Sequence, residues 1–224
     1  MCARTRVQLT MKPTRYLLAI ALLTLSLHAQ TSQTQRPTST PYAGDLSIFE
    51  EPGREDKLQI NRVMDILHIA PGKAVADIGA GGGWFTVRAA HRVGEGGKVY
   101  GEDINPAAIK AIEQRTAKEH LPQVRAVLGT TDDPKLPAKS VDAVLMLKVY
   151  HEIADPLDFL ANLKPALAPG ARIGIIDRNG NGTDHGLKQS ILEKELREAG
   201  FREVEHYDFT KADGQDYFLV FEVR

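Results

Sequence analysis

A glycine-rich turn between a strand and a helix constrains this 224-residue chain more than any other feature. The stretch from Ala74 to Thr86 reads Ala-Val-Ala-Asp-Ile-Gly-Ala-Gly-Gly-Gly-Trp-Phe-Thr. Residues 74–78 predict a buried strand, and the glycines that follow predict a tight turn before a helix. Because Gly79 and Gly81 lack Cβ atoms, the backbone can approach a ligand closely, and the first helical turn offers free N–H groups. The sequence therefore predicts a ligand cradle at this turn.

The acid before the turn indicates the kind of ligand. Asp77 is expected at the carboxyl end of the strand, where a second negative charge would not favour the pyrophosphate of a dinucleotide. An acid in this place suits a ligand that carries an ammonium group. The pattern Asp77-x-Gly79-x-Gly81-x-Gly83 resembles the nucleotide-binding signature of class I S-adenosylmethionine-dependent methyltransferases, and the resemblance extends from about Leu58 to the C-terminus. It implies S-adenosylmethionine as the cofactor, held in this part of the chain by Asp77, Gly79, Ala80, Gly81 and Gly83.

A second acid follows the next predicted strand, residues 98–102. Asp103 closes that strand, and Asn105-Pro106 begins a helix with asparagine as the N-cap. An acid at this distance from the glycine turn can accept both ribose hydroxyls of an adenosine group, and Ile104 is assigned to the same part of the site. The other interpretation is that Glu102 or Asp103 only caps the helix.

The loop after the third predicted strand, Val124 to Leu128, contains two adjacent acids. In the family, an acid about four residues before a Leu-Pro pair reaches the adenine amino group, and the resemblance places Asp132 there. Two threonines separate Asp132 from Gly129, so Asp133 is the alternative. An Asp-Asp-Pro turn also forms without any ligand.

The apolar run 141–147 predicts a central parallel strand that carries polar residues to the ligand edge of the sheet. Lys148 comes first, and its charge would repel a sulfonium unless it pairs with the cofactor carboxylate or points away. His151 is the predicted general base for the acceptor, with Tyr150 and Glu152 able to orient it or the acceptor. The alternative is that His151 caps the next turn while Tyr150 packs in the core.

The C-terminal third predicts the end of the sheet. A strand at 172–177 leads into the polar loop 178–186, a candidate acceptor-binding loop. This loop lacks the terminal acid of a calcium-binding EF-hand because Lys188 stands there, and no metal site is predicted. A helix at 187–199 and a hairpin of residues 203–209 and 216–223 follow. The predicted fold is a Rossmann-like α/β sheet of seven strands, mostly parallel, with an antiparallel C-terminal hairpin strand and helices on both faces.

The N-terminal 29 residues are typical of a secretory signal peptide, because basic residues precede the apolar run Tyr16 to Leu27 and a small residue, Ala29. This run is shorter than the roughly 20 residues that span a membrane. We therefore expect a periplasmic or secreted protein, with an uncleaved membrane anchor as the alternative. Residues 30–53 predict a flexible linker before a domain at 54–224. Four apolar residues near the linker's end are candidates for a lid over the cofactor or for ordinary packing: Tyr42, Leu46, Ile48 and Phe49.

The balance of charges bears on the partners. With 28 basic and 29 acidic side chains the net charge is -1, so no cationic field favours nucleic acid or an anionic membrane. The expected activity is methyl transfer from S-adenosylmethionine to a small-molecule acceptor. A nicotinamide-dependent oxidoreductase is one alternative, although Trp84 replaces the third small residue of its fingerprint. A non-enzymatic S-adenosylmethionine binder is another, because an exported enzyme needs its cofactor outside the cytoplasm.

Overall fold

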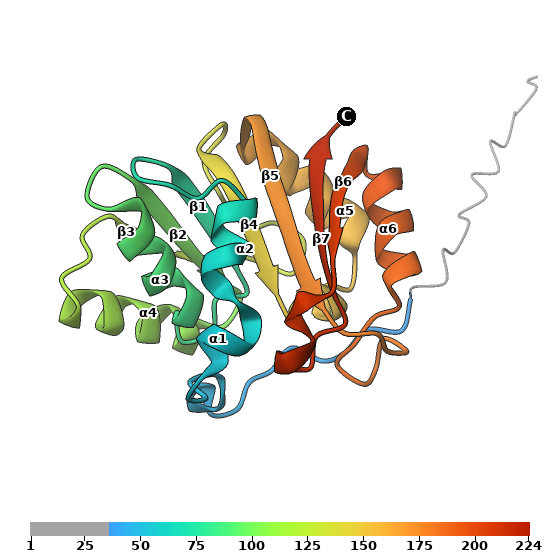
Figure 1. Ribbon diagram of the computed structural model, residues 1–224, viewed down its shortest axis with the longest axis horizontal. Coiled ribbons are helices and arrows are strands. Elements are labelled where there is room, and N and C mark those ends of the chain that lie inside the picture. Colours follow the sequence, from blue (N-terminus) through green and yellow to red (C-terminus); the bar gives the residue numbers. More distant parts are fainter. Residues whose placement is uncertain (1–35) are drawn as a thin grey trace, which may run out of the picture. The chain divides into compact units, whose positions relative to one another are not determined.

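One mixed sheet forms the centre of the fold in a computed structural model that describes residues 36–224. The predicted signal peptide lies outside the described residues. The sheet has seven strands in the order β3-β2-β1-β4-β5-β7-β6 (Figure 1). Their bounds are β1 (Ala74–Ile78), β2 (Lys98–Asp103), β3 (Val124–Leu128), β4 (Val141–Leu147), β5 (Leu167–Asp177), β6 (Phe201–Tyr207) and β7 (Tyr217–Val223). Strands β1 to β5 pair in parallel, and β7 is antiparallel to β5 and β6. The predicted fold class is confirmed.

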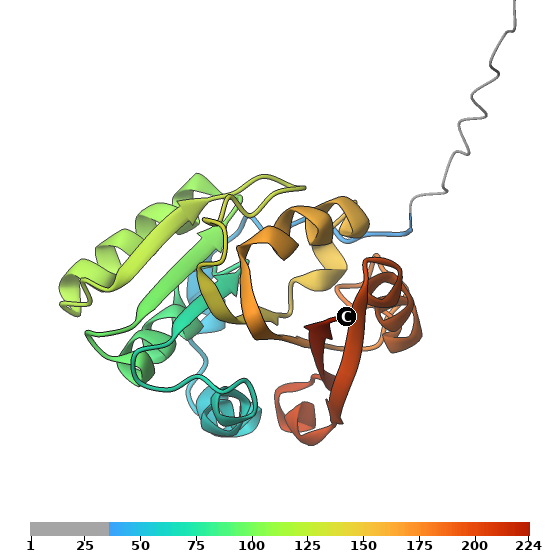
Figure 2. The ribbon, with the colours of Figure 1, turned by 90° about the horizontal axis from the view of Figure 1, so that it is seen from above.

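Helices cover both faces of this sheet (Figure 2). They are α1 (Arg54–Leu58), α2 (Ile60–Ile66), α3 (Trp84–Val93), α4 (Pro106–Lys118), α5 (Pro156–Leu163) and α6 (Gln189–Glu198), with 3-10 turns η1 (Leu46–Phe49), η2 (Tyr150–Glu152), η3 (Lys164–Ala166) and η4 (Phe209–Asp213). One buried cluster joins α2 and α3 to Leu145 of β4, and a second joins α5 and α6 to Val144 and Met146. Both faces of β4 are buried, which explains its continuous apolar run.

Several predicted boundaries differ from those observed; for example, β6 is Phe201–Tyr207 and not 203–209. Strand β5 begins at Leu167 instead of Arg172, because Leu167 pairs with Val141 across an irregularity in the β4–β5 register. Helix α6 begins at Gln189, because Leu187 forms an isolated antiparallel bridge with Asn181 and is not helical.

The segment before α1 lies against the domain and passes the carboxyl ends of the parallel strands (Figure 1). The Arg36 guanidinium donates 2.9 Å hydrogen bonds to the carbonyls of Tyr150 and Ile153 and pairs with Glu195 at 2.9 Å. Ser39 is buried, and its hydroxyl donates to the Gly182 carbonyl. The described part of the predicted linker therefore makes specific polar contacts that its composition does not reveal.

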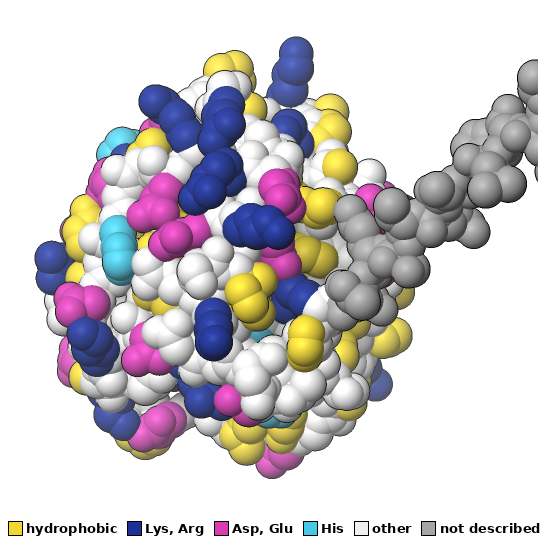
Figure 3. All heavy atoms as spheres, turned by 90° about the vertical axis from the view of Figure 1, so that its right-hand side faces the viewer, with side chains coloured by type: hydrophobic (Ala, Val, Ile, Leu, Met, Phe, Trp, Pro, Cys, Tyr) yellow, Lys and Arg dark blue, Asp and Glu magenta, His cyan; other side chains and the backbone are white. Residues whose placement is uncertain are grey.

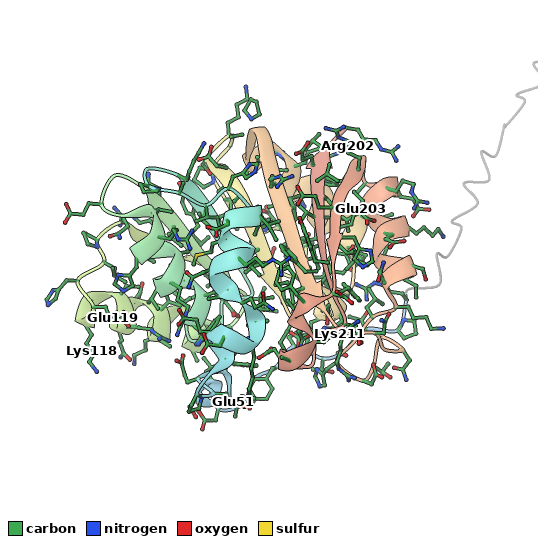
Figure 4. The ribbon with its side chains drawn as sticks, in the orientation of Figure 1. Glu51, Lys118, Glu119, Arg202, Glu203 and Lys211 are labelled. Carbon is green, nitrogen blue, oxygen red and sulfur yellow. The ribbon has the colours of Figure 1, made fainter. Side chains whose placement is uncertain are left out.

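Charged side chains of both signs cover the outside of the domain. The face in Figure 3 intersperses basic and acidic groups, so the surface drawn there in colour offers no single-sign track of the kind that binds nucleic acid. Six of these exposed groups are labelled in Figure 4: Glu51, Lys118, Glu119, Arg202, Glu203 and Lys211. Within residues 36–224, no helix is long and apolar enough to cross a membrane.

Candidate cofactor and acceptor site

A cavity of about 670 Å³ opens at the carboxyl ends of β1, β2 and β4, and the segment 38–49 supplies part of its wall. Its volume falls in the range of roughly 300–1,000 Å³ that is usual for small-molecule sites, and this edge is where open α/β sheets bind ligands. Eight of the predicted site residues line it: Asp77, Gly79, Ala80, Gly81, Asp103, Ile104, Lys148 and Glu152.

The turn after β1 requires glycine for two physical reasons. Gly79 has φ +65°, and a Cβ built on it would lie 2.4 Å from the Val149 side chain. Gly81 has φ +54° and lines the cavity. Gly83, with φ +79°, stands at the N-cap of α3 and is not among the lining residues. It turns the chain into the helix, and its contact with the cofactor stays a prediction.

Asp77 is a buried acid on the cavity wall. Its side chain accepts a 2.6 Å hydrogen bond from the Thr86 hydroxyl of α3, and the residue is 2% exposed. Burial raises the pKa of Asp77 to about 7, with the Thr86 bond acting in the opposite direction. A cationic ligand group beside it would favour the ionised form.

Asp103 lies on the same wall and is tied to the glycine turn. Its two carboxylate oxygens accept 2.8 Å hydrogen bonds from the amides of Gly81 and Asn105. The helix cap is Asn105 itself, whose side chain accepts from the amide of Ala107. Asp103 is therefore not the N-cap of α4. Its side chain binds the glycine turn and lines the cavity.

Glu102 is a lining residue that sequence reasoning missed as a ligand group. It is 2% exposed, and its Oε1 has no hydrogen-bond partner among the described residues. Burial raises the pKa of Glu102 to about 8, and neighbouring Asp103 raises it further. The sequence feature that could have identified Glu102 as a ligand group is its charge at the end of the buried strand β2.

Two cations line the cavity together. Lys148 has φ +60°, a left-handed conformation rare for lysine that is often found at functional sites. Arg54 of α1 stacks over the Trp84 ring at 4.4 Å and lies 3.9 Å from Asp213. Burial lowers the pKa of Lys148, while Asp213 opposes that effect. Arg54 was missed because α1 has only five residues and no periodic pattern.

The acids predicted to reach adenine do not line the cavity. Asp132 accepts a 2.7 Å hydrogen bond from the Thr130 hydroxyl, and Asp133 accepts from the amide and ammonium of Lys135. Both carboxylates therefore close a turn in this structure, and a contact of either with adenine stays a prediction. Thr130 and Thr131 line the cavity in their place.

The acceptor residues predicted after β4 separate into buried and cavity-facing groups. Tyr150 is fully buried and its hydroxyl donates to Glu195 at 3.0 Å, so it packs and does not face an acceptor. His151 is 3% exposed, with Nδ1 2.8 Å from an oxygen of Asp177. Only Glu152 of these three lines the cavity, and burial raises its pKa to about 7.

The polar loop after β5 contacts the N-terminal segment at Ser39, a residue that lines the cavity. The amide of His185 donates to the Ser39 hydroxyl at 2.9 Å. The His185 Nδ1 lies 3.7 Å from the Glu152 carboxylate. His185 lies in the loop predicted as a candidate acceptor-binding loop, whereas Asp177 was not predicted as a site residue, because its contact with His151 joins segments far apart in the chain.

Known proteins share this arrangement. A family described as "Methyltransferase domain" matches residues 76–173, from β1 into β5. A methyltransferase structure from Aquifex aeolicus, described as S-adenosylmethionine-dependent, aligns over 81% of this chain and 100% of its own with a TM-score of 0.72 and 24% identity. Residues 76–173 therefore match a methyltransferase domain, and the fold is that of S-adenosylmethionine-dependent methyltransferases. These matches imply S-adenosylmethionine as the cofactor, and the oxidoreductase alternative is not favoured.

Two relatives in sequence come from actinobacterial sources. Nocamycin O-methyltransferase of Saccharothrix syringae is 34% identical over 114 residues, which cover 51% of this chain and 41% of the relative. Aklanonic acid methyltransferase of Streptomyces sp. (strain C5) is 31% identical over 112 residues, 50% of this chain and 51% of the relative. The chain thus matches about half of each relative's length or less.

Proposed function

We propose that the protein transfers the methyl group of S-adenosylmethionine to a small-molecule acceptor. The observation that carries the proposal is a single cavity that holds the residues assigned to the cofactor and a further carboxylate outside that set. The cofactor acids Asp77 and Asp103 line it together with Glu152. The names of the two relatives, which act on nocamycin and aklanonic acid, support a small-molecule acceptor.

The side chains match the charges of the cofactor. When bound, S-adenosylmethionine supplies a methyl group on a positively charged sulfur, ready for in-line displacement. Asp77 would attract the ammonium group, Asp103 would accept the ribose hydroxyls, and Arg54 with Lys148 would pair with the carboxylate. Lys148 would then be neutralised and would not repel the sulfonium. Positioning in such a cavity can supply much of the rate, because a sulfonium is a good leaving group.

Binding and turnover test this proposal separately. Thermal unfolding should be followed with S-adenosylmethionine, S-adenosylhomocysteine and nicotinamide dinucleotides, since a ligand at 100 times its Kd adds about 2.7 kcal/mol of stability. We expect stabilisation by the first two only. Transfer of labelled methyl to candidate small molecules then tests catalysis. Stabilisation without transfer to any acceptor would favour the non-enzymatic binder, and stabilisation by dinucleotides alone would contradict the proposal.

The role of His151 follows from its place behind Glu152. Because its imidazole is buried and outside the cavity lining, His151 would act as a general base only through the Glu152 carboxylate, 3.8 Å from Nε2. His151→Ala should then lower methyl transfer by about 10²- to 10⁴-fold while the affinity for S-adenosylmethionine stays the same. Equal losses of stability, binding and transfer would instead indicate a structural role.

We also propose that the protein is exported, on the strength of its N-terminal sequence. A C-terminally tagged chain in its own host should be found outside the cytoplasm with a new N-terminus near Gln30. Cytoplasmic protein that retains Met1 or Met11 would contradict export, and membrane-bound protein with an intact N-terminus would indicate the anchor.

A further inference from the structure

Two imidazoles and a carboxylate converge where the turn η2 meets the loop between β5 and α6. The Nε2 atom of His151 lies 3.8 Å from Oε1 of Glu152, and Nδ1 of His185 lies 3.7 Å from the same oxygen. One nitrogen or oxygen from each of the three side chains lies within 4.8 Å of the others. His151 and Glu152 are neighbours in the chain, and tertiary structure brings His185 to them from more than 30 residues away.

Asp177 determines which nitrogen of His151 faces the other two groups. Its carboxylate oxygens lie 2.8 and 2.9 Å from Nδ1, and the residue is fully buried. Because a carboxylate accepts, Asp177 favours the ring form in which Nδ1 donates and Nε2 is left free to bind a metal. The Nε2 atom lies 3.8 Å from the Glu152 carboxylate. A cation between these two atoms would be bound by both.

We propose that His151, Glu152 and His185 bind a divalent first-row transition-metal ion, with Asp177 orienting His151. A buried carboxylate on the far nitrogen is the usual support of a metal-ligating histidine. Two imidazoles with one carboxylate suit zinc and its neighbours, whereas magnesium and calcium prefer oxygen ligands. The site differs from the EF-hand that the loop sequence excludes.

The spacing suits such an ion after a small adjustment. With metal–ligand distances of about 2.1 Å, a tetrahedral site places its ligand atoms about 3.4 Å apart. The observed 3.7 and 3.8 Å to Glu152 therefore need to close by a few tenths of an ångström, and the two histidine nitrogens, which lie within 4.8 Å of each other, by up to about 1.4 Å. His151 is held by Asp177, while the His185 side chain is 59% exposed on its loop and can supply the movement.

The site would leave a coordination position for an acceptor. Three protein ligands are the usual complement of a catalytic zinc site, and Glu152 lines the cavity. Resting on the proposed function, this arrangement selects acceptors with a hydroxyl or phenol group. Coordination would lower the pKa of that group so that its proton passes to water, and His151 would then serve as a ligand in place of the general base considered above. The oxygen would then form a bond to the methyl carbon while the carbon–sulfur bond breaks and its electron pair remains on sulfur.

Metal binding can be measured without cofactor or acceptor. After treatment with a chelator and its removal, the full chain should bind one Zn²⁺ per molecule by calorimetry. Co²⁺ should give the visible absorption of a site with nitrogen and oxygen ligands. His185→Ala and Glu152→Gln should each weaken Zn²⁺ binding at least 10-fold. The matched control is His206→Ala, an exposed histidine on β6, which should bind like the unaltered protein.

Two readouts separate this proposal from the proposed function. His185→Ala should leave the melting temperature and the affinity for S-adenosylmethionine unchanged, because His185 is exposed and is not a cavity-lining residue. Zn²⁺ binding that is absent in the unaltered chain, or equal in all variants, would overturn the metal site. That result would not bear on cofactor binding. It would indicate that His151 and Glu152 share a proton where the metal ion was proposed. Loss of cofactor binding with intact Zn²⁺ binding would contradict the proposed function only.

Discussion

Replacing Glu102 by glutamine should remove a loss of stability that the unaltered protein suffers as pH rises. The carboxyl group is 2% exposed, and burial raises its pKa from 4.5 to about 8 in the folded state. Between these values the folded protein keeps a proton that the unfolded chain has released. The free energy of unfolding should therefore fall by about 1.4 kcal/mol per pH unit across this window. From pH 5 to pH 8 the loss from this one group amounts to about 3–4 kcal/mol.

Glutamine matches the shape of the protonated acid and does not titrate, so Glu102→Gln should gain about 3–4 kcal/mol over the unaltered protein between pH 5 and pH 8. Urea denaturation at both pH values measures the difference; Asp77 titrates in both proteins, and its charge acts on Glu102 less strongly than burial does. Glu113→Gln, at an exposed position of α4, is the control and should show no such change. If the variant and the unaltered protein differ in free energy of unfolding by the same amount at pH 5 and at pH 8, Glu102 is already ionised in the folded protein. The reasoning from its burial would then be wrong.

Three further outcomes test the cavity. Asp103→Ala should weaken S-adenosylmethionine binding by about 10²- to 10⁴-fold, since two hydrogen bonds to a charged acceptor are lost at about 1.5–3 kcal/mol each, while exposed Asp158→Ala should not. Arg54→Ala should weaken it about 10- to 100-fold in calorimetry, whereas Arg62→Ala, which loses a stack on Phe209 outside the cavity, should not. Affinity should rise about 20-fold from pH 5.5 to 7.5 as Asp77 ionises around pH 7, and a rise that persists in Asp77→Asn would exclude Asp77 as its cause.

The sequence by itself determined the cofactor half of the molecule. A strand, glycine turn and helix are local, so the positions of Asp77, Gly79 and Gly81 follow from residues close to them in the chain. Strand β2 ends one helix later, and parallel pairing brings Asp103 to the same edge. Alternation of buried residues and the position of turns were sufficient for seven strands and their order of appearance, because both depend on short-range geometry.

Only the tertiary structure decided the acceptor half. His151, Asp177 and His185 meet across three separate segments, and no spacing along the chain reveals that contact. The same holds for the segment at residues 36–43, whose polar composition predicts a linker but whose Arg36 finds buried partners over 110 positions away. Sequence patterns record which face of an element is apolar. They do not record which polar groups the folded chain encloses together, because that depends on how loops cross the edge of the sheet.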